Sequence, residues 1–222
     1  METGAGPPEV CEAALDDLVG RARALAADGQ RRILGITGAP GAGKSTLARQ
    51  LADALAGRAA LIGLDGFHLS NAELHRLGRH ARKGASDTFD AAGYRHLLTR
   101  LRPQHDDIVY AAEFDRGLEE SIACAVPVRR AVPLIITEGN YLLVDDDRWG
   151  GVAALLDQSW YVEPGENLRL ERLIARHMRF GRTPEEAAER SHGSDQINAA
   201  LIETTRHRAD LIVRVTTARG PA

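Results

Sequence analysis

Cysteine and long apolar runs are scarce in this sequence, and it has no excess of positive charge. Its two cysteines, Cys11 and Cys124, form no C-x-x-C pair and no arrangement with histidine that marks a nucleophile. We therefore expect no thiol or metal–cysteine chemistry, and a reducing compartment. No stretch is apolar for long enough to span a bilayer, and residues 1–8 lack the basic start and apolar core of a signal peptide. These absences predict a cytoplasmic protein with no membrane partner.

The charge balance argues against a general nucleic-acid binder. The chain has 28 Lys and Arg residues against 31 Asp and Glu residues, for a formal net charge of -3. Proteins that bind nucleic acids nonspecifically usually carry a cationic excess that displaces counterions from phosphates. We expect no nucleic-acid partner. The sequence leaves the oligomeric state open and is compatible with a homodimer.

Short apolar runs alternate with stretches long enough to hold helices. Within residues 1–30, apolar side chains recur at helical spacing from about Glu9 to Ala27, which predicts an amphipathic N-terminal helix. The expected strands are 33–37, 59–64, 108–112, 133–137, 160–162 and 211–215. This alternation predicts an α/β fold with a mostly parallel sheet and helices on both faces. No repeat or composition break appears, so we expect one domain over residues 1–222.

A glycine-rich stretch between an expected strand and an expected helix fits the phosphate-loop pattern G-x-x-x-x-G-K-[ST]. Its residues are Gly38, Ala39, Pro40, Gly41, Ala42, Gly43, Lys44 and Ser45, followed by Thr46. Glycines let successive backbone N–H groups turn toward one anion, and the following helix directs its positive end to the same place. Lys44 can reach the β- and γ-phosphates of ATP, and the Ser45 hydroxyl can ligate Mg²⁺. The competing interpretation is an ordinary glycine-rich turn.

Two carboxylates follow apolar runs that should end at the same edge of the sheet. Asp65 follows the run 59–64 and can orient an acceptor hydroxyl and accept its proton. Glu138 follows the run 133–137 and, with Ser45, can hold Mg²⁺ and its water shell. Each of the two could instead cap a helix.

Residues 168–188 are rich in Arg and Glu and contain Gly181 and Pro184, which predicts two helices around a mobile turn, a candidate lid. Spacings of three or four place several arginines on one helical face, where guanidinium groups could close over a phosphate. The alternative is a solvated face of ion pairs. The arginines are Arg169, Arg172, Arg176, Arg179 and Arg182.

These residues resemble the P-loop kinase group that contains uridine kinase, bacterial pantothenate kinase and phosphoribulokinase, and are most similar to sugar (fructose-type) or nucleoside kinase-like members. The likeness runs from Ile33 onward and rests on residues 38–46, 65–68, 82–90 and 138–143, with additional similarity at 114–116 and 180–182. Ser86 and Ala112 stand where relatives often have proline. The resemblance implies a three-layer P-loop nucleoside triphosphate hydrolase fold.

The resemblance also implies roles for individual residues. Asp65 would be the catalytic base, Ser45 and Glu138 would serve the metal, and Asp90 would bind acceptor hydroxyls. Lys44, Arg172 and Arg176 are expected to assist the transfer, and Arg182 to contact the nucleotide. The expected acceptor contacts are Phe67, His68, Arg82, Phe89, Asp90, Arg116, Glu138 and Tyr141, several of which could instead be core or surface residues.

The sequence thus predicts a kinase that moves a phosphoryl group from ATP, with Mg²⁺, to a hydroxyl of a small molecule. Two alternatives stay open. One is an ATP-binding switch that controls a partner and has no acceptor. The other is a nucleotide-monophosphate kinase, which the basic cluster at 75–83 would favour if it attracts an anionic acceptor; a solvated helix face is the other explanation of that cluster.

Overall fold

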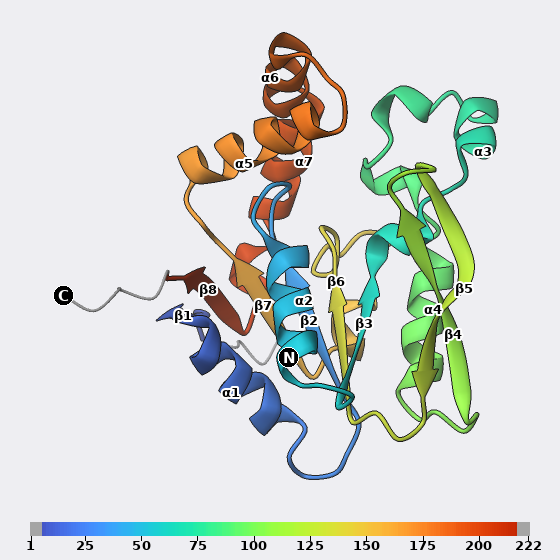
Figure 1. Cartoon of the computed structure of the whole chain (residues 1–222), viewed down its shortest axis with the longest axis vertical. Helices are drawn as coiled ribbons and strands as arrows, with labels where there is room; N and C mark the ends of the chain where they lie inside the picture. The colour runs from blue at the N-terminus through green and yellow to red at the C-terminus, as the bar shows by residue number, and fades with distance from the viewer. Residues whose placement is uncertain (1–5, 217–222) are drawn as a thin grey trace.

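The computed structural model describes residues 6–216, and a six-stranded parallel sheet runs through its centre (Figure 1). Its strand order is β1-β8-β7-β2-β6-β3, and every neighbouring pair is parallel. The strands are β1 (Glu9–Ala13), β2 (Arg32–Thr37), β3 (Ala59–Gly63), β6 (Leu134–Glu138), β7 (Gln158–Val162) and β8 (Leu211–Val215). Strands β2 and β6 are paired in the interior of the sheet, so their carboxyl ends lie side by side.

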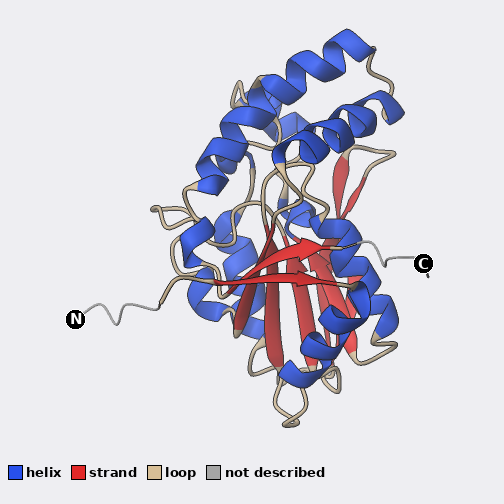
Figure 2. Ribbon diagram, turned by 90° about the vertical axis from the view of Figure 1, so that its left-hand side faces the viewer, coloured by secondary structure: helices blue, strands red, loops and turns tan. Residues whose placement is uncertain are grey.

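Seven α-helices are found among the described residues, and they surround the sheet or stand above its carboxyl edge (Figure 2). They are α1 (Leu15–Leu25), α2 (Lys44–Ala54), α3 (Asn71–Arg76), α4 (Ala91–Leu101), α5 (Glu166–Arg179), α6 (Pro184–His192) and α7 (Ser194–Glu203). Short 3₁₀ turns occur at Leu64–Phe67, His80–Arg82, Ser86–Thr88, Ala153–Leu155 and Arg206–Arg208.

The sheet is apolar on both faces because successive side chains of each strand point to opposite sides. Leu34 and Ile36 of β2 join the core that includes the buried faces of α1 and α2. Ile33, one residue earlier, joins the core that includes α4. The predicted arrangement of a parallel sheet with helices on both faces is therefore confirmed.

The N-terminal segment differs from its prediction. The expected helix over residues 9–27 divides into strand β1 and helix α1, with Ala14 as the N-cap of the helix. Val10 pairs with Ile212 of β8, which adds β1 to the edge of the sheet. The apolar spacing before Ala14 reflects an edge strand, and a run of five residues is too short for periodicity to separate the two structures.

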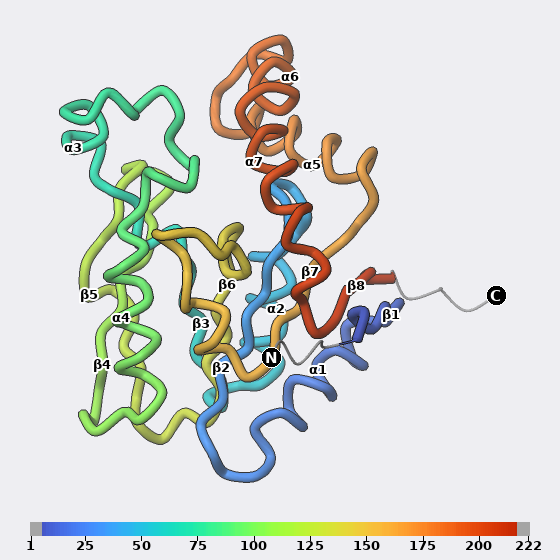
Figure 3. Tube along the Cα trace, turned by 180° about the vertical axis from the view of Figure 1, so that it is seen from behind, coloured from blue at the N-terminus to red at the C-terminus, as the bar shows by residue number. Residues whose placement is uncertain are grey.

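The expected strand at 108–112 also differs from its prediction, because it does not join the central sheet. It is part of β4 (Ile108–Asp115), which pairs antiparallel with β5 (Glu120–Arg129), a strand that the sequence reading missed. The β4–β5 hairpin lies beside α4 at the β3 edge of the main sheet (Figures 1 and 3). Gly66 allows this packing, since a Cβ there would come within 2.5 Å of the Ala112 carbonyl oxygen.

Helices α5, α6 and α7 form a group at the carboxyl end of the sheet, above the loop that precedes α2 (Figures 1 and 3). The two helices predicted within 168–188 are present as α5 and α6, joined by a turn at 180–183. The side chain of Thr183 caps α6 by accepting a hydrogen bond from the Glu186 amide at 3.2 Å. No helix in residues 6–216 has the length and apolar character needed to cross a membrane.

Candidate functional site

The phosphate loop joins β2 to α2 and has the geometry of an anion cradle. Gly41 and Gly43 have φ values of 84° and 97°, which residues with a Cβ rarely adopt. Gly43 is the N-cap of α2, so the first amides of the helix open into the loop. A Cβ on Gly43 would lie 3.3 Å from Nη1 of Arg172, which places that guanidinium against the loop. The cradle predicted from the sequence is present.

Lys44 is the first residue of α2 and is buried, with 8% of its surface exposed. Its Nζ donates a hydrogen bond to the Ala39 carbonyl at 3.0 Å. Burial lowers the pKa of Lys44 from 10.5 to about 8, although the negative charge of Glu138 opposes this shift. An anion bound in the cradle would give the Lys44 ammonium group a partner of opposite charge.

Asp65 follows β3 and Glu138 ends β6, and these two strands are neighbours in the sheet. Gly63 pairs with Glu138 in the sheet, and Asp65 follows two residues later in the turn Leu64–Phe67. Helix-capping roles are not seen for either carboxylate: the next helix after Asp65 is capped by Ser70, and Glu138 is the last residue of β6. The two groups therefore converge at the carboxyl edge of the sheet.

Glu138 is nearly buried at the end of β6. Burial raises the pKa of the Glu138 carboxyl, and the negative charge of Asp65 raises it further, whereas Lys44 and the Ser45 hydroxyl lower it. Asp65 has 36% of its side chain exposed and pairs with Arg116, whose Nη2 lies 2.8 Å from its Oδ2. One carboxylate is thus enclosed beside the phosphate loop, and the other faces open space.

This arrangement fits Mg²⁺ together with a triphosphate. Magnesium in nucleotide sites usually takes one or two protein oxygens, phosphate oxygens and water. Ser45, in the first turn of α2, and Glu138, the last residue of β6, offer such a pair of oxygen ligands beside the cradle. Within residues 6–216, no cluster of three or more His, Cys, Asp or Glu side chains forms a metal cage.

A buried hydrogen-bond chain supports the strands that carry both carboxylates. The Tyr94 hydroxyl of α4 lies 2.6 Å from Oγ1 of Thr137, the residue before Glu138. Thr137 in turn donates to the Ile62 carbonyl of β3 at 2.9 Å. The Tyr94 side chain has no exposed surface and is part of the core.

Arg169 fastens the start of α5 to the phosphate loop, a contact that the sequence reading missed. Only 3% of its surface is exposed, and Nη1 donates to the Pro40 carbonyl at 3.0 Å. Its Nη2 bonds to Glu166 at 2.7 Å and also to Gln196 of α7. The position of Arg169 one helical turn before Arg172 was the available sequence signal. Spacing alone could not show that Arg169 is buried and the other arginines are exposed.

Arg172 and Arg176 follow Arg169 at intervals of one turn, and both are exposed. Although part of the Arg176 side chain reaches solvent, the protein around its guanidinium lowers the pKa, and the positive charge of Arg116 lowers it further. Arg182 lies in the turn between α5 and α6. The arginine face predicted for this segment therefore divides into a buried residue that fastens α5 and guanidinium groups that are free to meet a ligand.

His68 lies beneath Asp65 within an aromatic group. Its Nδ1 is 2.9 Å from the Asp65 carbonyl oxygen, and its ring lies 4.0 Å from Phe89 and 4.9 Å from Phe114, between ring centroids. Burial lowers the pKa of His68, so the ring is neutral at pH 7. Phe67 packs edge-on against Tyr94 at 5.3 Å. Phe67, His68 and Phe89 thus form the floor below Asp65.

Three other residues expected to contact the acceptor already have partners within the protein. Tyr141 has no exposed surface, and its hydroxyl donates to the Gly84 carbonyl at 2.6 Å, so it is a core residue. Asp90 is exposed and is the N-cap of α4, accepting from the Gly93 amide at 2.8 Å. Arg82 is ion-paired with Asp87, with 2.6 Å from Nη2 to Oδ2. The contact of Tyr141 joins positions 57 residues apart, which spacing along the chain does not show.

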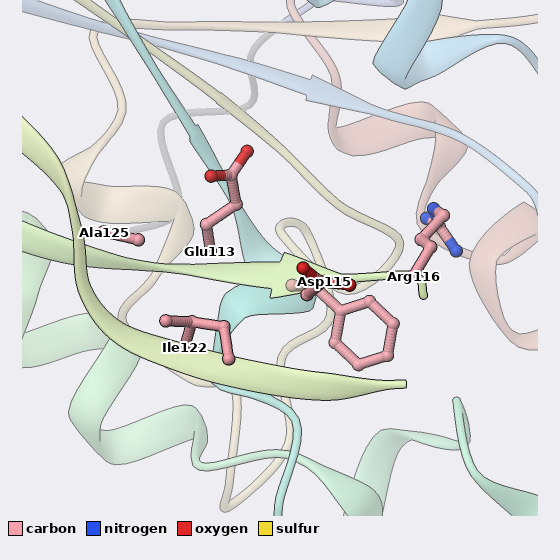
Figure 4. Close-up of a pocket in the computed structure, with 6 residues that line it drawn as sticks. Glu113, Asp115, Arg116, Ile122 and Ala125 are labelled. Atoms are coloured by element: carbon pink, nitrogen blue, oxygen red, sulfur yellow. The ribbon is translucent and has the colours of Figure 1, made fainter. Parts of the chain in front are cut away.

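A cavity of 390 Å³ lies along the β4–β5 hairpin, and Figure 4 shows its lining side chains. In this view Glu113 projects toward β3, whereas Arg116 projects toward the α5–α7 side. Arg116, one of the lining residues, pairs with Asp65. The hollow therefore adjoins the carboxylate site through Arg116 and includes no phosphate-loop residue. It is lined by Glu113, Phe114, Asp115, Arg116, Ile122 and Ala125.

Several known proteins are similar to this chain in sequence or in fold. A uridine kinase-like protein of Schizosaccharomyces pombe is 33% identical over 210 residues, which cover 90% of this chain and 89% of that protein. A solved structure titled as a fructose transport system kinase-like protein of Silicibacter has a TM-score of 0.79 and 35% identity, covering 90% of this chain and 98% of that one. The solved structure of YFH7, a P-loop kinase-like protein of Saccharomyces cerevisiae, has a TM-score of 0.78 at 16% identity and covers 93% and 100% of the two chains.

No family model matches the sequence. The identity and coverage of the Schizosaccharomyces pombe relative nevertheless show the family. The fold and the phosphate loop are consistent with that family. The chain belongs to the P-loop kinases, in the group of uridine kinase-like proteins. The family resemblance expected from the sequence is confirmed.

Proposed function

We propose that this protein transfers the γ-phosphoryl group of Mg-ATP to a hydroxyl of a small molecule, such as a nucleoside, a sugar or a pantothenate-like alcohol. The observation that carries the proposal is the position of Asp65, a half-exposed carboxylate at the same sheet edge as the phosphate loop and Glu138. An ATP-binding switch would not require a second carboxylate open to an acceptor. A cytoplasmic location and a homodimer stay predictions from the sequence.

In the proposed reaction, Asp65 takes the proton of the acceptor hydroxyl while the hydroxyl oxygen bonds to the γ-phosphorus. The bond from that phosphorus to the oxygen bridging the β- and γ-phosphates breaks, and ADP leaves with the electron pair. Lys44 and the amides of the loop hold the phosphates, and Arg172 and Arg176 meet the equatorial oxygens. Bound Mg²⁺, held by Ser45 and Glu138, would neutralise charge that builds up on the phosphates.

The side chains around the acceptor region favour an uncharged acceptor over a nucleotide monophosphate. In the basic cluster at 75–83, Arg76 pairs with Glu73, at 2.6 Å from Nη2 to Oε1. Arg79 and Arg82 both pair with Asp87. Glu73 balances Arg76, and Asp87 partly balances Arg79 and Arg82, which weakens the case for the cluster as a phosphate site.

The test is an ADP-release screen with Mg-ATP over nucleosides, sugars, pantothenate-like alcohols and phosphosugars. At least one neutral alcohol should accelerate ADP formation. Asp65→Asn should then lower kcat by about 10²- to 10⁴-fold, the usual contribution of a general base, with little change in ATP affinity. Asp53→Asn, at an exposed position on α2, is the matched control. Full activity of Asp65→Asn would exclude it as the base, and slow ATP loss that no compound accelerates would favour the switch.

A further inference from the structure

The contact between Arg116 and Asp65 occupies the group that the proposed reaction requires as a base. Arg116 follows β4 at the tip of the hairpin, and its Nη2 donates to Oδ2 of Asp65 at 2.8 Å. A carboxylate held by a guanidinium has one oxygen engaged and its negative charge stabilised. An acceptor hydroxyl that donates to Asp65 must therefore compete with Arg116.

The ion pair between Arg116 and Asp65 is weak enough for Arg116 to exchange Asp65 for another partner. The two side chains are 44% and 36% exposed, and ion pairs at such exposure are weak because water and salt screen them. The guanidinium carbon lies 5.7 Å from the centre of the Phe114 ring. That ring can hold the cation by its face when the ion pair opens. Little free energy is needed to release Asp65.

The charged groups around Arg116 indicate which second partner its guanidinium could bind. Its positive charge acts on the pKa values of both Arg176, on α5, and Glu138, at the end of β6, so it lies within electrostatic reach of both sides of the site. Arg116 and Arg176 repel each other in the absence of an anion between them. A γ-phosphate bound near both guanidinium groups would bring negative charge that relieves this repulsion.

We propose that Arg116 changes partners during catalysis: it pairs with Asp65 in the resting enzyme and moves onto an oxygen of the γ-phosphoryl group when ATP and the acceptor are bound. This inference rests on the proposed function of the same site. It gives the hairpin arginine two roles, which are to stabilise the transferred group and to mask the base until the acceptor arrives.

Masking has a chemical consequence. If Asp65 were free beside bound ATP, it could take a proton from water, whose oxygen would bond to the γ-phosphorus while the bond to the bridging oxygen breaks. The products would be ADP and inorganic phosphate, without any transfer to an acceptor. An Arg116 that holds Asp65 suppresses this hydrolysis, so its loss should change the ratio between hydrolysis and transfer.

The experiment compares full-length wild type with Arg116→Gln and Arg116→Lys. Phosphorylated acceptor and inorganic phosphate are measured separately. Arg116→Gln should lower transfer kcat about 100-fold or more, as expected for an arginine that meets the transferred phosphoryl group. The ratio of hydrolysis to transfer should rise at least tenfold. Arg116→Lys should recover part of both effects, because it keeps the charge but not the two-pronged geometry.

Arg130→Gln is the matched control. Arg130 lies just beyond the other end of the hairpin and also forms an exposed ion pair of 2.8 Å, with Asp107. This variant should leave transfer and hydrolysis unchanged. Thermal unfolding of all variants shows whether the hairpin stays folded.

Two results for Arg116→Gln would overturn the exchange: an unchanged ratio of hydrolysis to transfer, or an unchanged kcat for transfer. Failure of every acceptor with wild type would instead refute the proposed kinase activity. In that case phosphate release with ATP alone still decides the masking role, since Arg116→Gln must hydrolyse ATP faster than wild type. A faster rate supports masking, and an equal or slower rate refutes it.

Discussion

Replacing Lys44 with methionine should make the nucleotide-free protein more stable while abolishing nucleotide binding. The lysine is buried at the start of α2, where its nearest neutral partner is the Ala39 carbonyl. Methionine has a similar length and no charge, so it removes the cost of burying an ammonium group. The Ala39 carbonyl keeps a hydrogen bond from the Ala42 amide at 3.0 Å, which limits the loss.

The magnitude follows from the pKa of Lys44, which burial lowers from 10.5 to about 8. At pH 7 the group is charged in both the folded and unfolded states, and the difference in pKa corresponds to roughly 3 kcal/mol of destabilisation. A pKa that is lower in the folded state means that the unfolded chain binds more protons, so stability from this group rises between pH 8 and pH 10.5. The advantage of methionine should therefore fall from about 3 kcal/mol at pH 7 to about 1 kcal/mol at pH 10.

Urea unfolding of both proteins at several pH values measures this difference directly. Arg49→Met, at an exposed position on the same helix, controls for the general effect of replacing a cation with methionine and should change stability by less than about 0.5 kcal/mol. Mg-ATP should raise the unfolding temperature of wild type and of Arg49→Met but not of Lys44→Met. Equal or lower stability of Lys44→Met at pH 7, or a stability difference that does not depend on pH, would refute the argument that burying the charged lysine destabilises the protein.

Two further substitutions test the support around the site. Gly41→Ala should destabilise the protein by about 1–3 kcal/mol and weaken ATP binding, because φ is 84° and a Cβ would lie 2.6 Å from the Arg169 carbonyl oxygen; calorimetric titration with ATP that gives wild-type affinity would contradict this. Tyr94→Phe should lower the free energy of unfolding by about 1 kcal/mol through loss of its buried bond to Thr137. Urea unfolding checks this, and an unchanged free energy of unfolding would show that the hydrogen bond does not stabilise the protein.

The sequence alone was sufficient for the fold class and the phosphate loop, since both depend on local signals. Glycines before Lys44 mark a turn that approaches an anion, and apolar runs separated by helix-length stretches mark a parallel sheet. The N-terminal strand was misread as the start of a helix, because five residues are too few for periodicity to separate the two structures. Strand β4 was misread as part of the central sheet, because a hairpin strand shows the same short apolar run as a central strand. Pairing partners distant in the chain distinguish these cases, and a single sequence does not reveal them.

Residue identity determined which chemistry this protein could carry: a lysine and glycines for phosphates, and two carboxylates after apolar runs for metal and base. Only the tertiary structure decided which polar groups are already engaged. Tyr141 and Arg82 are occupied by partners within the protein, Arg169 fastens α5 to the loop, and Arg116 reaches Asp65 across 51 positions of the chain. The physical reason is that charge type belongs to a residue, whereas burial and pairing depend on what the folded chain brings within a few ångströms of it.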